Sequence, residues 1–241
     1  MPEILAALAS IPARAPFLRS VLESLRPHVD RIHVFLNGYD DVPDVVLDLA
    51  DEHVVSADNG GAERKFWWSD RWTGYYLSCD DDIVYPADYV PAICEAIADH
   101  EGQALVTCHG RTYLGTPRAI HEVEPASIGK FHKRVDYGRF VNCGGTGVMG
   151  WDAGTVRVPS QWRDRNMADL QTAVWAQQNA VPIWLIPHRA HWFRPLQLMD
   201  PQGIYRTSQR ERHVRRNALL VEQGHRAPWR LFQLPALSSD R

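Results

Sequence analysis

The sequence has no long apolar run, few cysteines and little net charge, and each shortage narrows the class of protein. No stretch approaches the roughly 20 apolar residues that cross a bilayer, so no membrane span is expected. The four cysteines are widely spaced, without a Cys-x-x-Cys pair, which favours buried, reduced thiols over a zinc ribbon or a redox dithiol. A net charge of -3 over 241 residues argues against nucleic-acid binding by the whole surface.

The first residues also lack the features of an export signal. MPEILAALASIPARAP has neither a basic leader nor a small-residue cleavage site of the expected form, and its apolar part is only about ten residues long. We therefore expect a buried first strand and a cytoplasmic protein. With 45% hydrophobic residues, the chain can form one sizeable core.

Apolar runs and helical spacings alternate along the chain. Buried strands are expected at 4–11, 31–38 and 52–57, with helices at 17–25 and 44–50 between them. Further expected elements are a helix over 60–68, a strand over 74–79, a helix from 88 to 102, a strand over 103–110, a helix over 167–178 and a strand over 181–187. Strands that alternate with helices predict an α/β fold with a mainly parallel sheet.

Two segments depart from this alternation. Residues 111–140 have weak periodicity and many polar side chains, so loops and irregular strands are expected there, in the manner of a mobile lid. Beyond residue 200 the composition becomes basic. Arginines crowd a predicted helix at positions 206, 210, 212, 215 and 216. We expect a domain over 1–200 and a basic C-terminal extension over 201–241, either as a solvated helix packed on the domain or as a contact for a membrane surface, a nucleic-acid acceptor or a partner chain.

Gly145, Gly147 and Gly150 form a literal G-x-G-x-x-G. A dinucleotide-binding fingerprint needs a helix directly after its glycines. WDAGTVRVP stands there instead, with a glycine, β-branched residues and a proline. The sequence therefore predicts a tight turn between strands, or glycines that let a substrate approach the backbone.

The stretch LSCDDDIVYP carries Asp80, Asp81 and Asp82 at the end of the strand predicted over 74–79. Adjacent carboxylates repel one another and lose hydration near apolar walls, so such a cluster either faces open solvent as a capped turn or holds a cation. Asn37 and residues 58–61 follow neighbouring strands, and the carboxyl ends of parallel strands share one crevice. Mg²⁺ and Mn²⁺ prefer oxygen ligands and often bind substrate phosphates as well.

The order SIPARAPFLRSVLESL, VFLNG, a basic segment and LSCDDDIVYP resembles glycosyltransferases of the GT-A fold, especially the family 2-like enzymes, over residues 4–195. The resemblance implies a Rossmann-like, mixed and mainly parallel sheet flanked by helices, with a C-terminal helical extension added here. It also implies Mn²⁺- or Mg²⁺-dependent transfer of a sugar from a nucleoside-diphosphate sugar to the hydroxyl of a saccharide or other acceptor. The D-x-D motif of these enzymes matches Asp80 and Asp82.

The same resemblance assigns residues to the nucleotide. Pro12 and Arg14, after the first strand, would border it, and Asn37 stands where the family usually has an aspartate that contacts the base. Arg64 and Lys65 would lie near the nucleotide or its phosphates, the alternative being an exposed helix face.

The resemblance further implies roles around the sugar. Asp82 would bind the metal and Asp80 the ribose or the metal, while Asp81 would either point away or make supporting contacts near the donor. Gly145 would belong to a glycine-containing stretch below the donor sugar and the acceptor. His191, after the last strand, would be a further metal ligand, although a lone histidine is more often structural.

Asp169 matches the general base of inverting members, while Ala168 replaces the acid that precedes it in the family. The other interpretation of Asp169 is a first-turn aspartate favoured by the helix dipole, in which case a retaining mechanism becomes open. Two other functions compete. A sugar-phosphate nucleotidyltransferase uses a similar sheet and metal, but SIPARAP lacks its glycine-rich loop. A non-catalytic nucleotide-sugar-binding module is favoured by Ala168 and Asn37.

Overall fold

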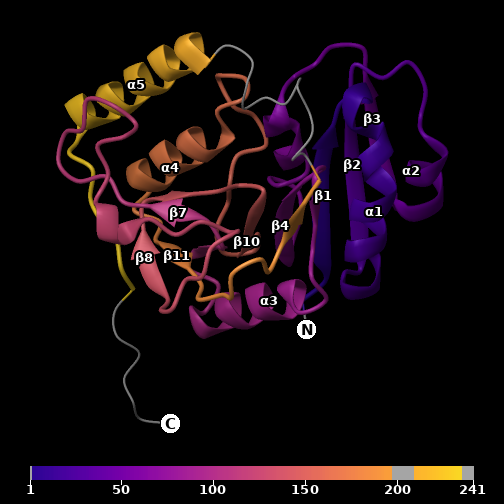
Figure 1. Cartoon of the computed structure of the whole chain (residues 1–241), viewed down its shortest axis with the longest axis horizontal. Coiled ribbons are helices and arrows are strands. Elements are labelled where there is room, and N and C mark those ends of the chain that lie inside the picture. Colours follow the sequence, from indigo (N-terminus) through magenta and orange to yellow (C-terminus); the bar gives the residue numbers. More distant parts are fainter. Residues whose placement is uncertain (1, 197–208, 235–241) are drawn as a thin grey trace.

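A mixed sheet of eight strands forms the centre of the computed structural model, which describes residues 2–196 and 209–234. The strand order is β3-β2-β1-β4-β10-β6-β11-β8 (Figure 1). The strands are β1 (Ile4–Ser10), β2 (Arg31–Asn37), β3 (Glu52–Ser56), β4 (Tyr75–Asp80), β6 (Leu105–Thr107), β8 (Arg139–Val141), β10 (Val148–Asp152) and β11 (Ile183–Leu185).

Most of these strands are parallel. β1 pairs in parallel with β2 and β4, β2 with β3, and β6 with β11. Only β10 and β8 run against their neighbours. The mixed and mainly parallel sheet that the sequence predicts is therefore confirmed.

Helices cover both faces of the sheet. They are α1 (Ala15–Leu25), α2 (Asp44–Leu49), α3 (Tyr89–Asp99), α4 (Ala168–Gln178) and α5 (Gln209–Arg226). In β1, Ala6 and Leu8 pack with α1 and α3 in one core cluster, while Leu5 and Ala7 pack in a second cluster that includes part of α4. Alternate residues of a strand point to opposite faces, so β1 is buried on both sides, as the apolar run ILAALAS predicts.

The chain after α4 is joined to the domain through a third core cluster. Leu219, Leu220 and Trp229 pack there with Tyr113 and Met167. Figure 1 shows α5 lying beside α4 at the upper left, with α2 at the right-hand side and α3 at the bottom. Within the described residues, α5 is thus a packed helix; Arg206 lies outside them. Among all the residues that the structure describes, from β1 onward, no helix is long and apolar enough to cross a bilayer.

Three local expectations are tested by the observed elements. The helix predicted over 60–68 is wrong in kind and length: only a 3₁₀ helix, Ala62–Phe66, forms, because Gly61 has a φ of +89°, a conformation that does not start an α-helix. Residues 111–140 are mainly irregular, as expected, with β7 (Gly110–Arg111) and a 3₁₀ helix, Pro125–Ser127. Gly145 and Gly147 lie in a turn between β9 (Cys143–Gly144) and β10, and Gly150 lies within β10. A strand therefore stands where a dinucleotide fingerprint needs a helix, and the rejection of that fingerprint is confirmed.

Candidate active site

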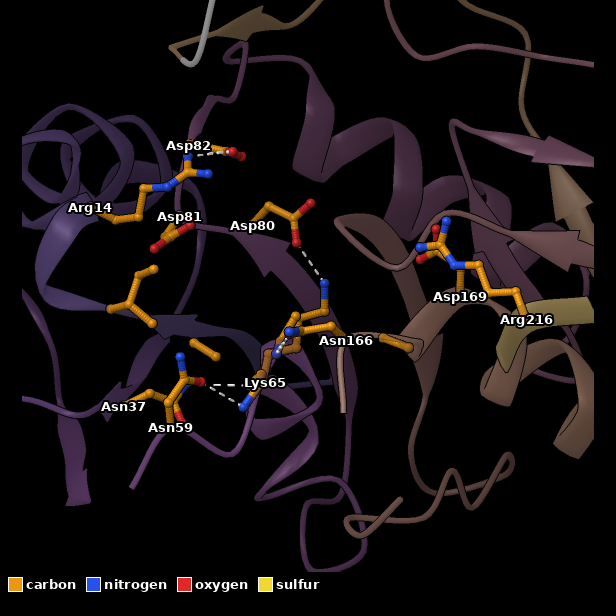
Figure 2. Close-up of a pocket in the computed structure, with 15 residues that line it drawn as sticks. Arg14, Asn37, Asn59, Lys65, Asp80, Asp81, Asp82, Asn166, Asp169 and Arg216 are labelled. Atoms are coloured by element: carbon orange, nitrogen blue, oxygen red, sulfur yellow. Dashed lines mark hydrogen bonds and ion pairs between the residues drawn. The ribbon is translucent and has the colours of Figure 1, made fainter. Parts of the chain in front are cut away.

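A cavity of about 300 Å³ lies at the carboxyl ends of β1, β2 and β4. Its lining includes the polar strand ends that the sequence places in one crevice: Asn37, Asn59, Gly61, Asp80, Asp81 and Asp82. Figure 2 shows the side chains of Asn37, Asn59 and the three aspartates around the cavity, with Asp169 and Arg216 on the side away from Arg14. The expectation that these strand ends meet is confirmed. We call this space the first cavity.

Arg14 and Asp82 form an ion pair at one wall of the first cavity. The Nη1 atom of Arg14 donates to Oδ2 of Asp82 at 2.7 Å, and the arginine is 3% exposed. Pro12 begins the 3₁₀ helix Pro12–Arg14, and the backbone N–H of Arg14 donates to the carbonyl of Ile11. Proline suits this first position because its φ is already helical and it has no N–H to lose. Pro12 is itself exposed and outside the cavity lining. It therefore affects the site only indirectly, by starting the 3₁₀ helix that positions Arg14.

Lys65 and Asp80 form a second ion pair, with 2.6 Å between Nζ and Oδ1. Lys65 is 2% exposed, which excludes the exposed-face alternative for this residue. The other carboxylate oxygen of Asp80 lies against Gly147, where a Cβ atom would be only 1.9 Å from it. Gly147 therefore lets β10 pass close to the carboxylate.

The three aspartates crowd one another. Burial, and next the charge of Asp82, raise the pKa of Asp81 to about 7. Burial, and next the charge of Asp80, raise the pKa of Asp82 to about 6. Raised carboxyl pKa values mean that the ionised cluster is unfavourable without added positive charge.

These residues fit a hard divalent cation by their chemistry. Among the described residues no group of three or more histidine, cysteine, aspartate or glutamate side chains is arranged to hold a metal. Mg²⁺ and Mn²⁺ do not need such a cage when one or two carboxylates and substrate phosphates supply the oxygens. Asp80 and Asp82 both line the first cavity, so they match that simpler donor set.

Asn37 shapes the loop beyond β3. Its Oδ1 accepts from the N–H of Gly60 at 3.0 Å, and its Nδ2 donates to the carbonyl of Gly61 at 3.3 Å. The residue is 1% exposed. Asn37 thus lines the cavity as predicted, and its amide holds the backbone of the loop that forms the cavity's edge.

Asp169 lies in the first turn of α4. Its Oδ1 accepts from the backbone N–H and the hydroxyl of Thr146, at 2.8 and 2.7 Å. Burial alone would raise its pKa, but the Thr146 N–H, the charge of Lys65 and the Thr146 hydroxyl together lower it. Asp169 is therefore an ionised carboxylate at neutral pH.

Glu63 fixes the start of α4 relative to Lys65. This 5% exposed carboxylate accepts hydrogen bonds from the N–H groups of Asn166 and Met167. It satisfies donors at the helix start that have no partner within the helix. The short helix that carries Lys65 is thereby tied to the helix that carries Asp169.

A second cavity, of about 320 Å³, shares Asp80, Asp169 and Arg216 with the first. Its remaining lining includes His109, Arg111, Tyr113, Phe131 and Gly145. Gly145 donates its N–H to the carbonyl of His109 at 2.6 Å. The predicted donor residue Gly145 therefore lies in the second cavity and outside the lining of the first.

Besides Pro12, the predicted site residues Arg64 and His191 lie outside both linings. The guanidinium of Arg64 lies over the rings of Phe35 and Trp67, with 5.3 and 5.4 Å to their centroids. These cation–π contacts keep the guanidinium of Arg64 against Phe35 and Trp67.

His191 is exposed, with a left-handed φ of +54°, and its N–H donates to the carbonyl of His132. Asp88 anchors the neighbouring turn by accepting from Arg189 and Trp192. The structure does not bring His191 into the cavity that Asp82 lines.

Sequence reasoning missed three site residues, Glu63, His109 and Arg111, and it gave no role of its own to Thr146. A usable signal existed for two of them, since His109 and Arg111 closely follow the strand Leu105–Thr107 and strand ends gather at the site. Thr146 stands next to glycines, so the search for a glycine motif passed over it. Arg216 is among the basic residues of the predicted extension, but its place beside Asp169 depends on how α5 packs.

No protein-family model matches the chain, and the comparison with curated proteins finds no match. Among solved structures, the chain is similar to S. aureus TarS 1–349, with 11% identity and a TM-score of 0.49, over 78% of this chain and 59% of that one. It is also similar to glucosyl-3-phosphoglycerate synthase from Mycobacterium tuberculosis in complex with Mn²⁺, UDP and glucosyl-3-phosphoglycerate. That match has 20% identity and a TM-score of 0.37, over 44% of this chain and 43% of the other. This chain thus spans less than two thirds of either structure, and likenesses this distant identify no substrate for it.

Proposed function

We propose that this chain is a metal-dependent glycosyltransferase that moves a sugar from a nucleoside-diphosphate sugar to an acceptor hydroxyl. The observation that carries the proposal is the first cavity, which joins three strand-end carboxylates and two buried cations to a separate ionised carboxylate, Asp169. The strand-end carboxylates and the buried cations can bind a diphosphate together with its metal ion. The separate carboxylate of Asp169 can accept a proton.

The donor nucleotide would lie along the carboxyl ends of β1 and β2. Arg14 is held at the wall by Asp82, and the loop fixed by Asn37 forms the edge. Lys65 adds a buried positive charge near the diphosphate. Because Arg14 and Lys65 are already fixed by ion pairs, they lose little side-chain freedom when the nucleotide binds.

Asp82, together with Asp80 and the donor diphosphate, would hold Mn²⁺ or Mg²⁺, which when bound neutralises charge on the departing diphosphate. Asp81 carries a raised pKa beside these two carboxylates. Because Asp81 lines the first cavity, its side chain would make supporting contacts near the donor. His191 could bind this metal ion only if it moved from its present turn toward the first cavity.

Asp169 would accept the proton of the acceptor hydroxyl. The hydroxyl oxygen forms a bond to the anomeric carbon while the bond from that carbon to the diphosphate oxygen breaks, with inversion at the carbon. Both hydrogen bonds from Thr146 use Oδ1, so Oδ2 is the oxygen we assign to the proton. A carboxylate with a lowered pKa is a weak base, but it is fully ionised at neutral pH.

Binding of a nucleotide with Mn²⁺ tests the donor site. UDP and GDP with Mn²⁺ should raise the Tm of the chain, and Asp82→Asn should remove most of this rise while Asp41→Ala, at an exposed position, leaves it unchanged. Asp82→Asn is preferred to alanine because it keeps a partner for the buried Arg14. An equal rise in Tm for the Asp82 variant would remove this residue from the metal site.

Turnover separates the proposed function from its rivals. A screen of nucleotide sugars with Mn²⁺, followed by mass spectrometry, should show slow donor hydrolysis that Asp169→Asn abolishes. Pyrophosphate release from a sugar phosphate and a nucleoside triphosphate would instead indicate nucleotidyl transfer. Donor binding without hydrolysis or transfer to any acceptor tested would indicate the binding module.

A further inference from the structure

The second cavity carries more positive than negative charge. Arg111, Arg216 and His109 line it together with Asp80 and Asp169. Asp80 is paired with Lys65, and burial first of all lowers the pKa of His109 to about 4, so this ring is neutral at pH 7. Two guanidinium groups and one carboxylate therefore remain to set the charge of the cavity.

Arg111 has no carboxylate partner of its own among the described residues. The ion pairs between described residues, with nitrogen and oxygen at most 4.0 Å apart, include neither Arg111 nor Arg216. The thiol of Cys143 raises the pKa of Arg111, burial lowers it, and the hydroxyl of Tyr113 and then the more weakly acting charge of Asp169 raise it again. Burial raises the pKa of Cys143 to about 11 and raises that of Tyr113 as well. Both neighbours are uncharged at neutral pH, so they do not neutralise the guanidinium.

A partly buried guanidinium without a paired anion loses hydration that nothing in the protein fully replaces. Arginine presents a planar fork of N–H donors that matches the oxygens of a phosphate or a carboxylate. Arg111 lines only the second cavity, whereas Arg216 lines both. An anion bound by Arg111 is therefore separate from the diphosphate that we assign to the first cavity.

The remaining walls of the second cavity suit the uncharged part of a small molecule. Phe131, Tyr113 and Ile120 supply apolar and aromatic surface, and Gly145 and Gly147 bring the backbone close. The cavity volume of about 320 Å³ lies at the lower end of the range for small-molecule sites. Asp169 borders this space as well as the donor cavity.

We propose that the second cavity binds an acceptor that carries a phosphate or carboxylate group, with Arg111 and Arg216 holding the anion while Asp169 meets the acceptor hydroxyl. This inference rests on the proposed function for the meaning of "acceptor", but the anion site itself does not depend on turnover. Arg111 acts here as a specificity residue, since it binds the part of the acceptor that does not react.

Equilibrium binding of matched ligands tests the site. Glucose 6-phosphate, glucuronate and glucose share one ring and differ in their charged group, and glycerol 3-phosphate and glycerol form a smaller pair. Calorimetric titration should show binding of at least one anionic ligand at least tenfold tighter than its neutral partner. A preference for the phosphates or for glucuronate then identifies the type of anion. The titrations are made on the chain alone and on the chain saturated with UDP and Mn²⁺.

Variants of Arg111 connect the preference to this cavity. Arg111→Gln should weaken anion binding by about ten- to a hundredfold, as expected for loss of a charge-assisted hydrogen bond, and Arg111→Lys should restore part of it. Arg118→Gln, on an exposed arginine of the same segment, is the matched control and should bind normally. The Tm of each variant checks that it is folded.

Each outcome bears on one proposal. Equal affinity for charged and neutral ligands, or anion binding that survives Arg111→Gln, would overturn the inference even if UDP and Mn²⁺ bind. Failure of UDP and Mn²⁺ to bind would overturn the proposed function, while the titrations without nucleotide would still confirm or refute the anion site.

Discussion

At the scale of single residues, Thr146 controls the protonation of Asp169. It donates both its N–H and its hydroxyl to one carboxylate oxygen, and each hydrogen bond favours the ionised form. Because the pKa of Asp169 is lowered, this interaction stabilises the folded chain above the carboxyl's ordinary pKa. The stabilisation is lost as the pH falls through the folded value.

Thr146→Val removes the hydroxyl donor and keeps the N–H. We expect the pKa of Asp169 to rise, so the acid limb of donor hydrolysis moves to higher pH while the rate at pH 8 changes little. Thr146→Ser, which keeps the hydroxyl, is the control. ¹³C NMR titration of the Asp169 carboxyl checks the shift without relying on activity. Identical titrations for the two variants would show that the hydroxyl has no such effect.

The two partners of the Lys65–Asp80 ion pair differ in burial, because the side chain of Lys65 is 2% exposed and that of Asp80 is 41% exposed. Asp80→Ala leaves a buried ammonium group without its partner and should cost about 3 kcal/mol of unfolding free energy. Lys65→Met leaves a carboxylate that water can reach and should cost less, about 1–2 kcal/mol. Urea unfolding measures both. A larger cost for Lys65→Met would contradict the assignment of the ammonium as the group that depends on its partner.

Residue types at strand ends were the part of the site that the sequence could predict. Asn37, Asp80 and Asp82 follow apolar runs, and the ends of parallel strands must meet. The resemblance implies a role for both Arg64 and Lys65, but it does not say which of these two neighbouring basic side chains turns inward. Lys65 is buried at the site and Arg64 lies on aromatic rings.

At the scale of elements, the approach of β10 to β4 depends on Gly147. The strands pair antiparallel, with Val148 opposite Cys79, so the residue before β10 lies beside Asp80. A Cβ atom there would overlap the carboxylate. The short turn after β9 thus sets the position of a predicted metal-binding side chain.

Gly147→Ala should displace the Asp80 carboxylate and break its contact with Lys65. We expect a loss of about 1–3 kcal/mol in stability, as for other overpacked sites, and a fall in Mn²⁺-dependent UDP binding of at least tenfold. Gly224→Ala in α5 is the control, because its Cβ would meet nothing closer than 3.5 Å. It should be neutral or stabilising by up to about 1 kcal/mol. Calorimetry and urea unfolding check both variants, and normal UDP binding by Gly147→Ala would refute the packing argument.

Elements that follow from the local sequence were predictable, whereas a segment shaped by distant partners was not. The helix expected over 167–178 is present as Ala168–Gln178. The segment expected as a helix over 60–68 is instead shaped by distant partners, since Glu63 bonds to residues more than 100 positions away. No local pattern encodes such a contact, so the link between Lys65 and Asp169 could not be predicted.

At the scale of the whole molecule, the C-terminal segment completes the site. The sequence divides the chain at residue 200, yet Leu219, Leu220 and Trp229 share a core cluster with Met167 and Leu170 of the preceding region. Arg216, between them and the cavities, lines both. The change to a basic composition thus reflects the exposed side of α5, whereas its buried side packs into a core cluster shared with the preceding region.

Trp229 tests how far the site depends on this packing. It is 2% exposed, its Nε1 donates to the carbonyl of Leu220 at 3.2 Å, and its backbone pairs with Gly115. Trp229→Ala should cost about 3–5 kcal/mol, as for other buried aromatic truncations, whereas Trp229→Phe, which keeps most of the ring, should cost less. Urea unfolding measures the stability of both variants.

The two cavities should respond differently to Trp229→Ala. Loosening α5 moves Arg216, so binding of an anionic ligand in the second cavity should weaken several-fold. Mn²⁺-dependent UDP binding should change less, because Arg14, Lys65 and the strand ends belong to other elements. Calorimetric titrations with UDP and with glucose 6-phosphate, made well below the Tm of the variant, compare the two. Equal weakening at both cavities would mean that α5 supports the whole sheet edge, and unchanged anion binding would mean that its packing does not position Arg216.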